Sequence, residues 1–260
     1  MLQKSEKMPA LFVGHGSPMN AIEDNSFTKT WEELAQRIPR PKAILSVSAH
    51  WYTKGSHVSD EARPKTIYDM YGFPEALYKV AYPASGAPEL AHKTKSLISR
   101  EVEIDNTWGL DHGTWSVLVR MYPQADIPVY QLSVDKSAGA EVHYRLGQEV
   151  AALREQGVLV FSSGNVVHNL SRISWDMEGG YPWAEEFDAY IRDRIEKRRF
   201  EDVLHYERAG ECARQSFYMP DHFYPLLYVL GASDEKDKLT VFNASCVMGS
   251  LSMTGYLFEA

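Results

Sequence analysis

Short apolar runs bounded by turn residues recur along this chain. They cover residues 10–14, 43–49, 129–134, 158–163 and 249–258. Unbroken apolar runs of this length are typical of strands that are buried on both faces of a sheet. We therefore predict that these segments form the strands of a central sheet.

Segments with helical periodicity alternate with these runs. The first such segment is residues 28–38, and the longer ones are residues 139–157 and 182–199. In the longer two, apolar residues recur at helical spacing and form one apolar face each: Val142, Leu146, Val150 and Leu153, then Ala184, Phe187, Ile191 and Ile195. Strands that alternate with helices predict an α/β fold, with a central mainly parallel or mixed sheet flanked by helices.

Length, charge and cysteine content narrow the class of protein. The chain has 260 residues and no linker-like tract, so we expect residues 1–260 to form a single domain. The net charge of −8, without a basic cluster, argues against nucleic acids and anionic membranes as partners. Two cysteines far apart in the sequence predict free thiols in a reducing compartment. With no apolar segment of about 20 residues and no signal peptide, a cytoplasmic location is expected.

Three histidines follow three of the predicted strands. His15 ends the stretch "LFVGH", His50 ends "ILSVSAH", and His168 comes soon after "VLVFSS". Parallel strands present their carboxyl ends at one edge of a sheet, where α/β proteins bind ligands. We therefore expect these three imidazoles to lie at the same edge.

Two more histidines stand at junctions between loops and helices. His112 lies in "WGLDHGTW", and His222 precedes "FYPLLYVLGA". Because proline is tolerated only in the first turn of a helix, Pro225 places His222 at or just before a helix start. The remaining histidines are expected at the surface, His92 and His143 on the solvent face of a helix and His57 and His205 in polar surroundings.

Imidazole is the commonest metal ligand among side chains, and two or three imidazoles with open positions suit Zn(II) or non-haem Fe(II). Phosphate-binding and nucleophile-elbow motifs are absent from the sequence. A Ser–His–Asp triad built on Ser17, Ser48 or Ser162 stays open as a minor alternative.

The histidine motifs together resemble those of one enzyme family. "PALFVGHGSPMN", "SAHW", "WGLDHGTW", "SSGNVVHNL" and "HFYPLLYVLGA" occur in this order, and "MGSLSM" follows. The set is similar to the class III (LigB-type) extradiol ring-cleavage dioxygenases, and within them to the 4,5-DOPA extradiol dioxygenase group. The resemblance covers nearly the whole chain and implies an α/β fold with a mononuclear metal site.

The resemblance also implies a role for each of the five histidines. His15, His50 and His222 match the metal ligands, although other class III enzymes use a glutamate as the third ligand. His168 matches a histidine that acts as the catalytic base and can approach the metal as a fourth ligand. His112 matches a histidine that contacts bound oxygen or substrate. One divalent metal per chain is implied, Fe(II) for ring cleavage or Zn(II) as found in the site.

The implied reaction opens a catechol such as L-DOPA with O2, next to the diol, to a muconic semialdehyde-type product. A zinc-dependent hydrolase and a non-catalytic metal-binding protein on the same scaffold remain alternatives. The implied partners are the catechol and O2, with a monomer or small homo-oligomer. Residues 52–87 are expected to shape the substrate range, and Trp51, Trp108 and Tyr224 either pack in the core or wall a ring pocket.

Overall fold

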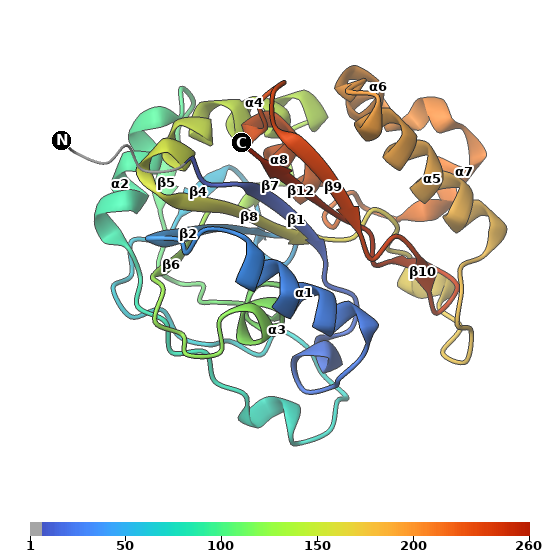
Figure 1. Cartoon of the computed structure of the whole chain (residues 1–260), viewed down its shortest axis with the longest axis horizontal. Coiled ribbons are helices and arrows are strands. Elements are labelled where there is room, and N and C mark those ends of the chain that lie inside the picture. Colours follow the sequence, from blue (N-terminus) through green and yellow to red (C-terminus); the bar gives the residue numbers. More distant parts are fainter. Residues whose placement is uncertain (1–6) are drawn as a thin grey trace.

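The computed structural model describes residues 7–260 and has a six-stranded sheet at its centre (Figure 1). The strand order is β6-β2-β8-β1-β12-β9. The strands are β1 (Ala10–Gly14), β2 (Ala43–Ser48), β6 (Val129–Gln131), β8 (Val158–Gly164), β9 (Lys238–Phe242) and β12 (Gly255–Glu259). Strands β6, β2, β8 and β1 pair in parallel, whereas β12 and β9 are antiparallel. The predicted α/β fold with a mixed central sheet is confirmed.

The parallel strands end in register at one edge of the sheet. Gly14 of β1 is opposite Gly164 of β8, and Ser48 of β2 is opposite Ser163 of β8. His15 and His50 leave the sheet immediately beyond these ends, and His168 follows β8 after a short connection. Because the three strands are adjacent and parallel, the three histidines share one edge, as the apolar pattern predicts.

Both faces of the sheet are buried, and successive residues of β1 show why. Ala10 and Phe12 pack into a core with α4 and α8, whereas Leu11 and Val13 pack into a second core with α1 and α3. Side chains alternate between the faces of a strand, so a strand covered on both faces must be apolar at every position.

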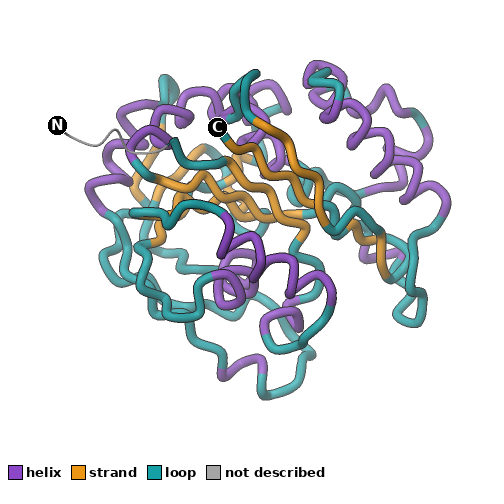
Figure 2. The backbone as a smooth tube through the Cα atoms, viewed as in Figure 1, coloured by secondary structure: helices purple, strands orange, loops and turns teal. Residues whose placement is uncertain are grey.

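Helices cover both faces of the sheet (Figure 2). The α-helices are α1 (Ser26–Arg37), α2 (Pro88–Leu97), α3 (His112–Met121), α4 (Ala140–Val150), α5 (Pro182–Glu196), α6 (Phe200–Leu204), α7 (Glu211–Ser216) and α8 (Tyr224–Ala232). Short 3₁₀ helices are η1 (Pro18–Ala21), η2 (Leu77–Lys79), η3 (Ala151–Gln156), η4 (Leu170–Arg172) and η5 (Tyr206–Ala209). Helices α5, α6 and α7 lie together beyond β9, at the right of Figure 1.

Two predicted strands are shorter than their apolar runs. The run 129–134 divides into β6 and β7 (Val134–Asp135), because its backbone partners change from β2 to Trp51 and His57. Similarly, 249–258 divides into β11 (Leu251–Ser252) and β12. The small strands form three two-stranded sheets: β3 (Tyr52–Thr53) with β7, β4 (Ser56–Val58) with β5 (Val102–Ile104), and β10 (Cys246–Val247) with β11.

One prediction about a helix face is wrong. His143 of α4 is fully buried rather than solvent-exposed. Its Nδ1 lies 3.1 Å from the hydroxyl of Tyr228, and its ring lies against Tyr224. The imidazole therefore packs between α4 and α8, with a polar partner that the sequence pattern does not reveal.

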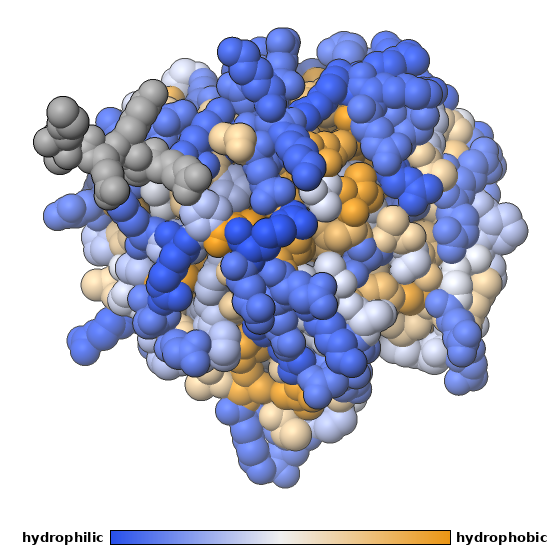
Figure 3. Space-filling view, in the orientation of Figure 1, coloured by the Kyte–Doolittle hydropathy of each residue, from blue (hydrophilic) through white to orange (hydrophobic). Residues whose placement is uncertain are grey.

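Both cysteines are buried free thiols, as predicted. Within residues 7–260, no helix has the length and apolar character needed to cross a membrane. The face shown in Figure 3 is mostly hydrophilic, with hydrophobic residues gathered in separate patches.

Candidate metal centre

The turn after β1 brings His15 close to the C-terminal segment of the chain. A Cβ atom on Gly14 would lie 2.6 Å from the backbone of Met253, and Gly16 has a φ of +61°, in the left-handed region. Glycine tolerates both the close approach and the positive φ. The two glycines therefore let the chain turn sharply at His15, whose side chain is almost fully buried.

Hydrogen bonds set the tautomer of His15. Ser163 donates its hydroxyl proton to the carbonyl oxygen of Gly113, at 2.6 Å. The Nδ1 atom of His15 lies 2.9 Å from the same hydroxyl oxygen, so Nδ1 must be the donor of that hydrogen bond. The proton of a neutral His15 is then on Nδ1, which leaves a lone pair on Nε2.

Asp69 orients both His50 and His112. Its Oδ2 atom lies 3.1 Å from Nδ1 of each ring, and its Oδ1 atom accepts a hydrogen bond from the backbone of His112. Asp69 Oδ2 has no partner in hydrogen-bond geometry, but its negative charge beside Nδ1 still favours the proton at that nitrogen, so Nε2 of His50 is the atom available to a ligand. The two histidines outweigh the burial of Asp69 and hold the pKa of its carboxyl well below the usual range.

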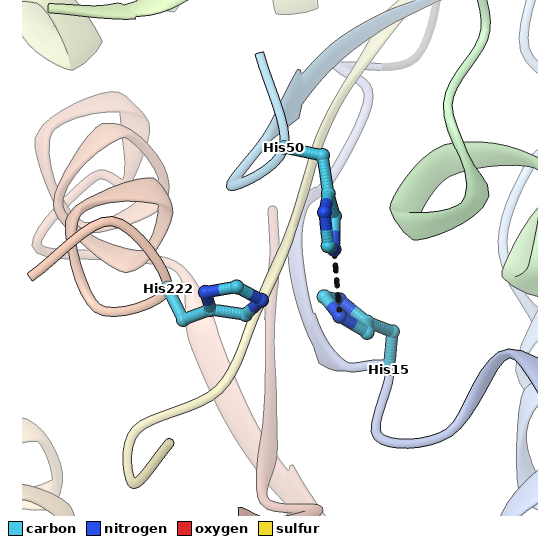
Figure 4. A group of neighbouring side chains, drawn as sticks. All are labelled: His15, His50 and His222. Carbon is cyan, nitrogen blue, oxygen red and sulfur yellow. Dashed lines mark hydrogen bonds between the residues drawn. The ribbon is translucent and has the colours of Figure 1, made fainter. Parts of the chain in front are cut away.

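The unprotonated nitrogens of His15 and His50 face each other (Figure 4). Their Nε2 atoms are 3.3 Å apart. Two opposed lone pairs repel, and either a proton on His50 or a cation near both atoms relieves that repulsion. Burial lowers the pKa of His50, but the carboxylates of Asp69 and Asp111 outweigh this effect and raise it overall.

His222 completes a three-histidine cluster with His15 and His50. One ligand nitrogen from each ring lies within 4.8 Å of the others. Both ring nitrogens of His222 are buried without a hydrogen-bond partner, although Nδ1 is 3.1 Å from a carboxylate oxygen of Asp221. Buried polar atoms normally have a partner. An orphaned imidazole that points at two further imidazoles fits a divalent metal ion.

His168 lies against the cluster, because its ring stacks on that of His222. Burial lowers the pKa of His168 well below the usual value, and the neighbouring His222 lowers it further. The pKa values of His15 and His222 are also well below the usual value, through burial first and the other histidines second. All three rings are therefore neutral at pH 7.

The N-terminus of α3 positions His112. Asp111 caps the helix by accepting a hydrogen bond from the backbone of Thr114, and it also accepts one from Ser48 of β2, at 2.6 Å. A Cβ atom on Gly113 would lie 2.9 Å from the ring of His50, so the helix approaches His50 closely. The rings of His50 and His112 are 3.8 Å apart between centroids. Burial, followed by the charge of His50, lowers the pKa of His112.

A cavity of about 480 Å³ opens onto these side chains. The five histidines predicted as site residues all line it, together with Asp69 and Asp221. The other walls come from three connecting regions and the C-terminal segment: Gly16, Ser17, Pro18, Met70, Tyr71, Phe73, Leu170, Ile173, Trp175, Met248 and Leu251. Residues 69–73 belong to the segment 52–87, which therefore contributes to the shape of the site.

The candidate aromatic residues do not line this cavity. Trp51 and Tyr224 are buried in the core, and the indole nitrogen of Trp108 donates to Asp111. Trp51 and Trp108 instead border a smaller pocket. The aromatic walls of the histidine cavity are Tyr71, Phe73 and Trp175.

The structure does not assemble the serine triad. Ser17 accepts a hydrogen bond from the backbone of Met19, Ser48 donates to Asp111, and the Ser162 hydroxyl is buried without a partner. Within the described residues, none of these three hydroxyls forms a hydrogen bond with a histidine ring. His92 is exposed, as predicted, and His57 and His205 are half-buried.

Sequence reasoning missed Asp69, Ser163 and Asp221. The last two stand inside or beside recognised motifs, in "SSGNVVH" and "PDHF", so adjacency to a histidine motif is a signal for them. Asp69 lies in an irregular segment without periodicity, and only the folded chain brings it to His50 and His112.

Residues 9–258 match the family described as the catalytic LigB subunit of aromatic ring-opening dioxygenase. The chain belongs to the LigB family. LigB dioxygenases are metal-dependent, and the cluster of His15, His50 and His222 offers a group of side chains able to hold a metal ion.

Curated LigB-type relatives and a solved structure resemble the chain over nearly its full length. The "4,5-DOPA dioxygenase extradiol" of Escherichia coli K12 is 45% identical, covering 97% of this chain and 95% of the relative. The Beta vulgaris protein of the same name is 38% identical, covering 96% of each chain. A crystal structure of an uncharacterized Escherichia coli K12 protein superposes with a TM-score of 0.83 at 42% identity, covering 96% of this chain and 99% of that one.

Proposed function

We propose that this protein is an extradiol dioxygenase that opens the ring of a catechol next to its diol, consuming O2. L-DOPA is the first candidate substrate, because relatives across nearly the whole chain carry the name 4,5-DOPA dioxygenase extradiol. The product would be of the muconic semialdehyde type. The observation that carries the proposal is the convergence of three imidazoles, from the ends of β1 and β2 and the start of α8, on one side of a cavity.

His15, His50 and His222 would hold one divalent metal ion. Nε2 of His15 and of His50 is free of the proton in the tautomers favoured by Ser163 and Asp69, and His222 has no other partner. When bound, Fe(II) supplies Lewis acidity and one-electron chemistry, whereas Zn(II) supplies only Lewis acidity. We therefore propose Fe(II) for ring cleavage, with Zn(II) as an alternative occupant of the site.

His168 would act as the base that takes a proton from a catechol hydroxyl. It lines the cavity and stacks on His222, so it stands beside the proposed ligand set. Burial keeps the ring neutral, and only a neutral imidazole can accept a proton. A fourth-ligand role for His168 stays a prediction, because the compact ligand group comprises His15, His50 and His222.

His112 would donate a hydrogen bond to a reacting oxygen atom. Its ring lies beside His50 at the cavity wall, and Asp69 fixes its orientation from the Nδ1 side. With the proton on Nδ1, Nε2 is an acceptor while the ring is neutral, so donation from Nε2 requires the imidazolium. Asp69 favours that form, although burial and the charge of His50 lower the pKa of His112 overall. The proposed role of His112 therefore includes stabilisation of negative charge that develops on oxygen.

We further propose that the whole chain acts as one catalytic domain. A cytoplasmic location and a monomeric or small homo-oligomeric state stay predictions from the sequence.

The proposal is tested by metal loading under anaerobic conditions. Metal-free protein is loaded with Fe(II) or Zn(II), the metal content is measured, and a panel of catechols and air is then added. We expect O2 consumption and a yellow semialdehyde absorbance only with Fe(II). The matched control is His92→Ala, which changes an exposed histidine and should leave both readouts unchanged.

Two outcomes contradict the proposal. Stoichiometric Fe(II) without O2 uptake on any catechol rules out the dioxygenase activity. Ester or amide hydrolysis by the Zn(II) form, independent of O2, supports the hydrolase alternative instead.

A further inference from the structure

The wall of the histidine cavity contains acidic side chains but, within the described residues, no lysine or arginine. Among the residues 7–260 that the structure describes, two carboxylates line it, Asp69 and Asp221, and neither a lysine nor an arginine does. Arg172 is close in sequence to two lining residues, Leu170 and Ile173, but its own side chain is not part of the wall. Apart from the histidine cluster and the metal ion that it would hold, the described cavity wall therefore offers a negatively charged substituent no cationic partner.

Large apolar side chains stand exposed at the cavity. Tyr71, Leu170 and Trp175 line it, although 91%, 58% and 71% of their surfaces are exposed. Tyr71 comes from the loop after Asp69, whereas Leu170 and Trp175 come from the segment after β8. Exposed apolar groups that gather around a cavity mark a surface that contacts a ligand. The aromatic faces of Tyr71 and Trp175 can also attract a cation.

The size of the cavity leaves room for more than the catechol ring. Its volume of about 480 Å³ is within the range of roughly 300–1,000 Å³ typical of sites for drug-sized ligands. With the diol directed at the histidines, the opposite side of the ring points away from them. A side arm at that position would extend towards Tyr71, Leu170 and Trp175.

Resting on the proposed function, we propose that this cavity selects catechols by the charge of the side arm. A cationic amine arm is favoured, a zwitterionic amino-acid arm is intermediate, and an anionic carboxylate arm is disfavoured. An amine that points away from the histidines finds the aromatic faces of Tyr71 and Trp175, whereas a carboxylate there finds neither a lysine nor an arginine among the described residues to pair with. The net charge of −8 acts in the same direction, because it attracts cationic ligands and repels anionic ones.

The test is a binding series without oxygen, so that no ring cleavage is needed for the readout. The probes are 3,4-dihydroxyphenethylamine, 3,4-dihydroxyphenylalanine and 3-(3,4-dihydroxyphenyl)propionate, and titration calorimetry on the metal-loaded protein measures their Kd values. We expect affinity to fall in that order, by about tenfold or more between the first and last probes. The difference should shrink as salt is raised, because the groups involved are partly exposed to solvent.

A substitution at the cavity wall should invert the order of affinity of the catechol probes. Leu170→Lys adds a cation at an exposed lining position, so it should strengthen binding of the propionate and weaken binding of the amine. Leu170→Gln is the matched control, since it changes the polarity but not the charge. Trp175→Ala should weaken binding of the amine, whereas Tyr218→Ala, which removes an exposed aromatic ring that does not line the cavity, should not.

Equal or tighter binding of the propionate by the unaltered protein overturns the proposal, as does an unchanged order in Leu170→Lys. The charge order can hold while O2 consumption is absent, which contradicts the proposed dioxygenase function alone. Conversely, ring cleavage without the charge order contradicts only the selectivity.

Discussion

The imidazole rings of His168 and His222 lie face to face, with centroids 3.4 Å apart and planes 4° from parallel. One ring follows β8 and the other precedes α8, so the stack joins a proposed base to a proposed metal ligand. Neutral rings can stack closely, whereas two imidazolium ions at this distance would repel each other. The rings touch but have different proposed roles. Substituting His222 should therefore change the metal content, whereas substituting His168 should change the turnover.

Replacing His222 by alanine should remove the metal. The change deletes one of three converging imidazoles, and we expect metal affinity to fall by more than the roughly 10–100-fold that loss of a supporting group costs. Metal content after dialysis, measured by mass spectrometry, is the readout, and His15→Ala should behave alike. Full metal content in either variant would remove that histidine from the ligand set.

Replacing His168 by alanine should affect turnover more than binding. Loss of a general base lowers kcat by about 10²–10⁴-fold, while the cluster of His15, His50 and His222 remains. Steady-state O2 consumption gives kcat, and anaerobic titration gives the catechol Kd. Turnover equal to that of the unaltered protein contradicts the role as base, and loss of metal in this variant would favour the fourth-ligand role.

Asp69→Asn should weaken the metal site without removing a ligand of the three-histidine cluster. The amide loses the negative charge that orients His50 and His112 from their Nδ1 sides, and we expect roughly 10–100-fold weaker metal binding. Competition with a metal chelator measures the affinity. The matched control is Asp60→Asn, because Asp60 pairs with the exposed His92 at 3.0 Å, outside the cavity. Equal effects of the two changes would show that Asp69 has no specific positioning role.

Asp237→Ala should destabilise the fold by about 3–5 kcal/mol. Asp237 accepts a 2.6 Å hydrogen bond from the fully buried guanidinium of Arg154, which also donates to the backbone of Met8, Ala232 and Phe258. Without the carboxylate, a buried cation is left without its counter-ion. Denaturant unfolding gives the free energy of unfolding. Glu211→Ala, which breaks an exposed pair with Arg214, should leave the free energy of unfolding almost unchanged.

The buried His143 should make stability depend on pH. Burial lowers its pKa from 6.5 to about 4; Asp135 and Arg100 face the ring, and Tyr224 and Tyr228 pack against it. The unfolded chain therefore binds this proton first as the pH falls. The contribution of neutral His143 to the free energy of unfolding is fully present above pH 6.5. It is lost as the pH falls from about 6.5 to 4, and the loss amounts to about 3 kcal/mol at most.

Unfolding curves across this pH range check the effect of His143. His143→Phe should lower the dependence of the unfolding free energy on pH in that window, while His92→Gln, an exposed site, should not. An identical pH dependence in His143→Phe would contradict the assignment, because the other buried histidines contribute equally in both proteins.

Part of the site follows from local sequence. The apolar runs of β1, β2 and β8 are buried on both faces, and parallel pairing of such runs places His15, His50 and His168 at one edge. Pro225 in the first turn of α8 similarly places His222 at its start. In each case, one short segment contains both the signal for the element and the chemical group.

Other features depend on contacts between distant segments. Asp69 reaches His50 and His112 because its loop is held by backbone hydrogen bonds between Ile67 and Leu110 and between Lys65 and Leu110. No periodicity marks such a loop, since its conformation comes from partners elsewhere in the chain. His143 is a similar case, because its burial depends on the hydroxyl of Tyr228, 85 residues away.

The sequence by itself determined the α/β class, the shared edge of His15, His50 and His168, and the resemblance to LigB dioxygenases. Hydrophobic periodicity and short motifs are local properties, so they can be recognised in the sequence without knowledge of the fold. Only the tertiary structure decided the tautomers set by Ser163 and Asp69, the stacking of His168 on His222, and the charge of the cavity wall. These arise from distances and directions between segments, which are fixed when the two cores pack on the sheet.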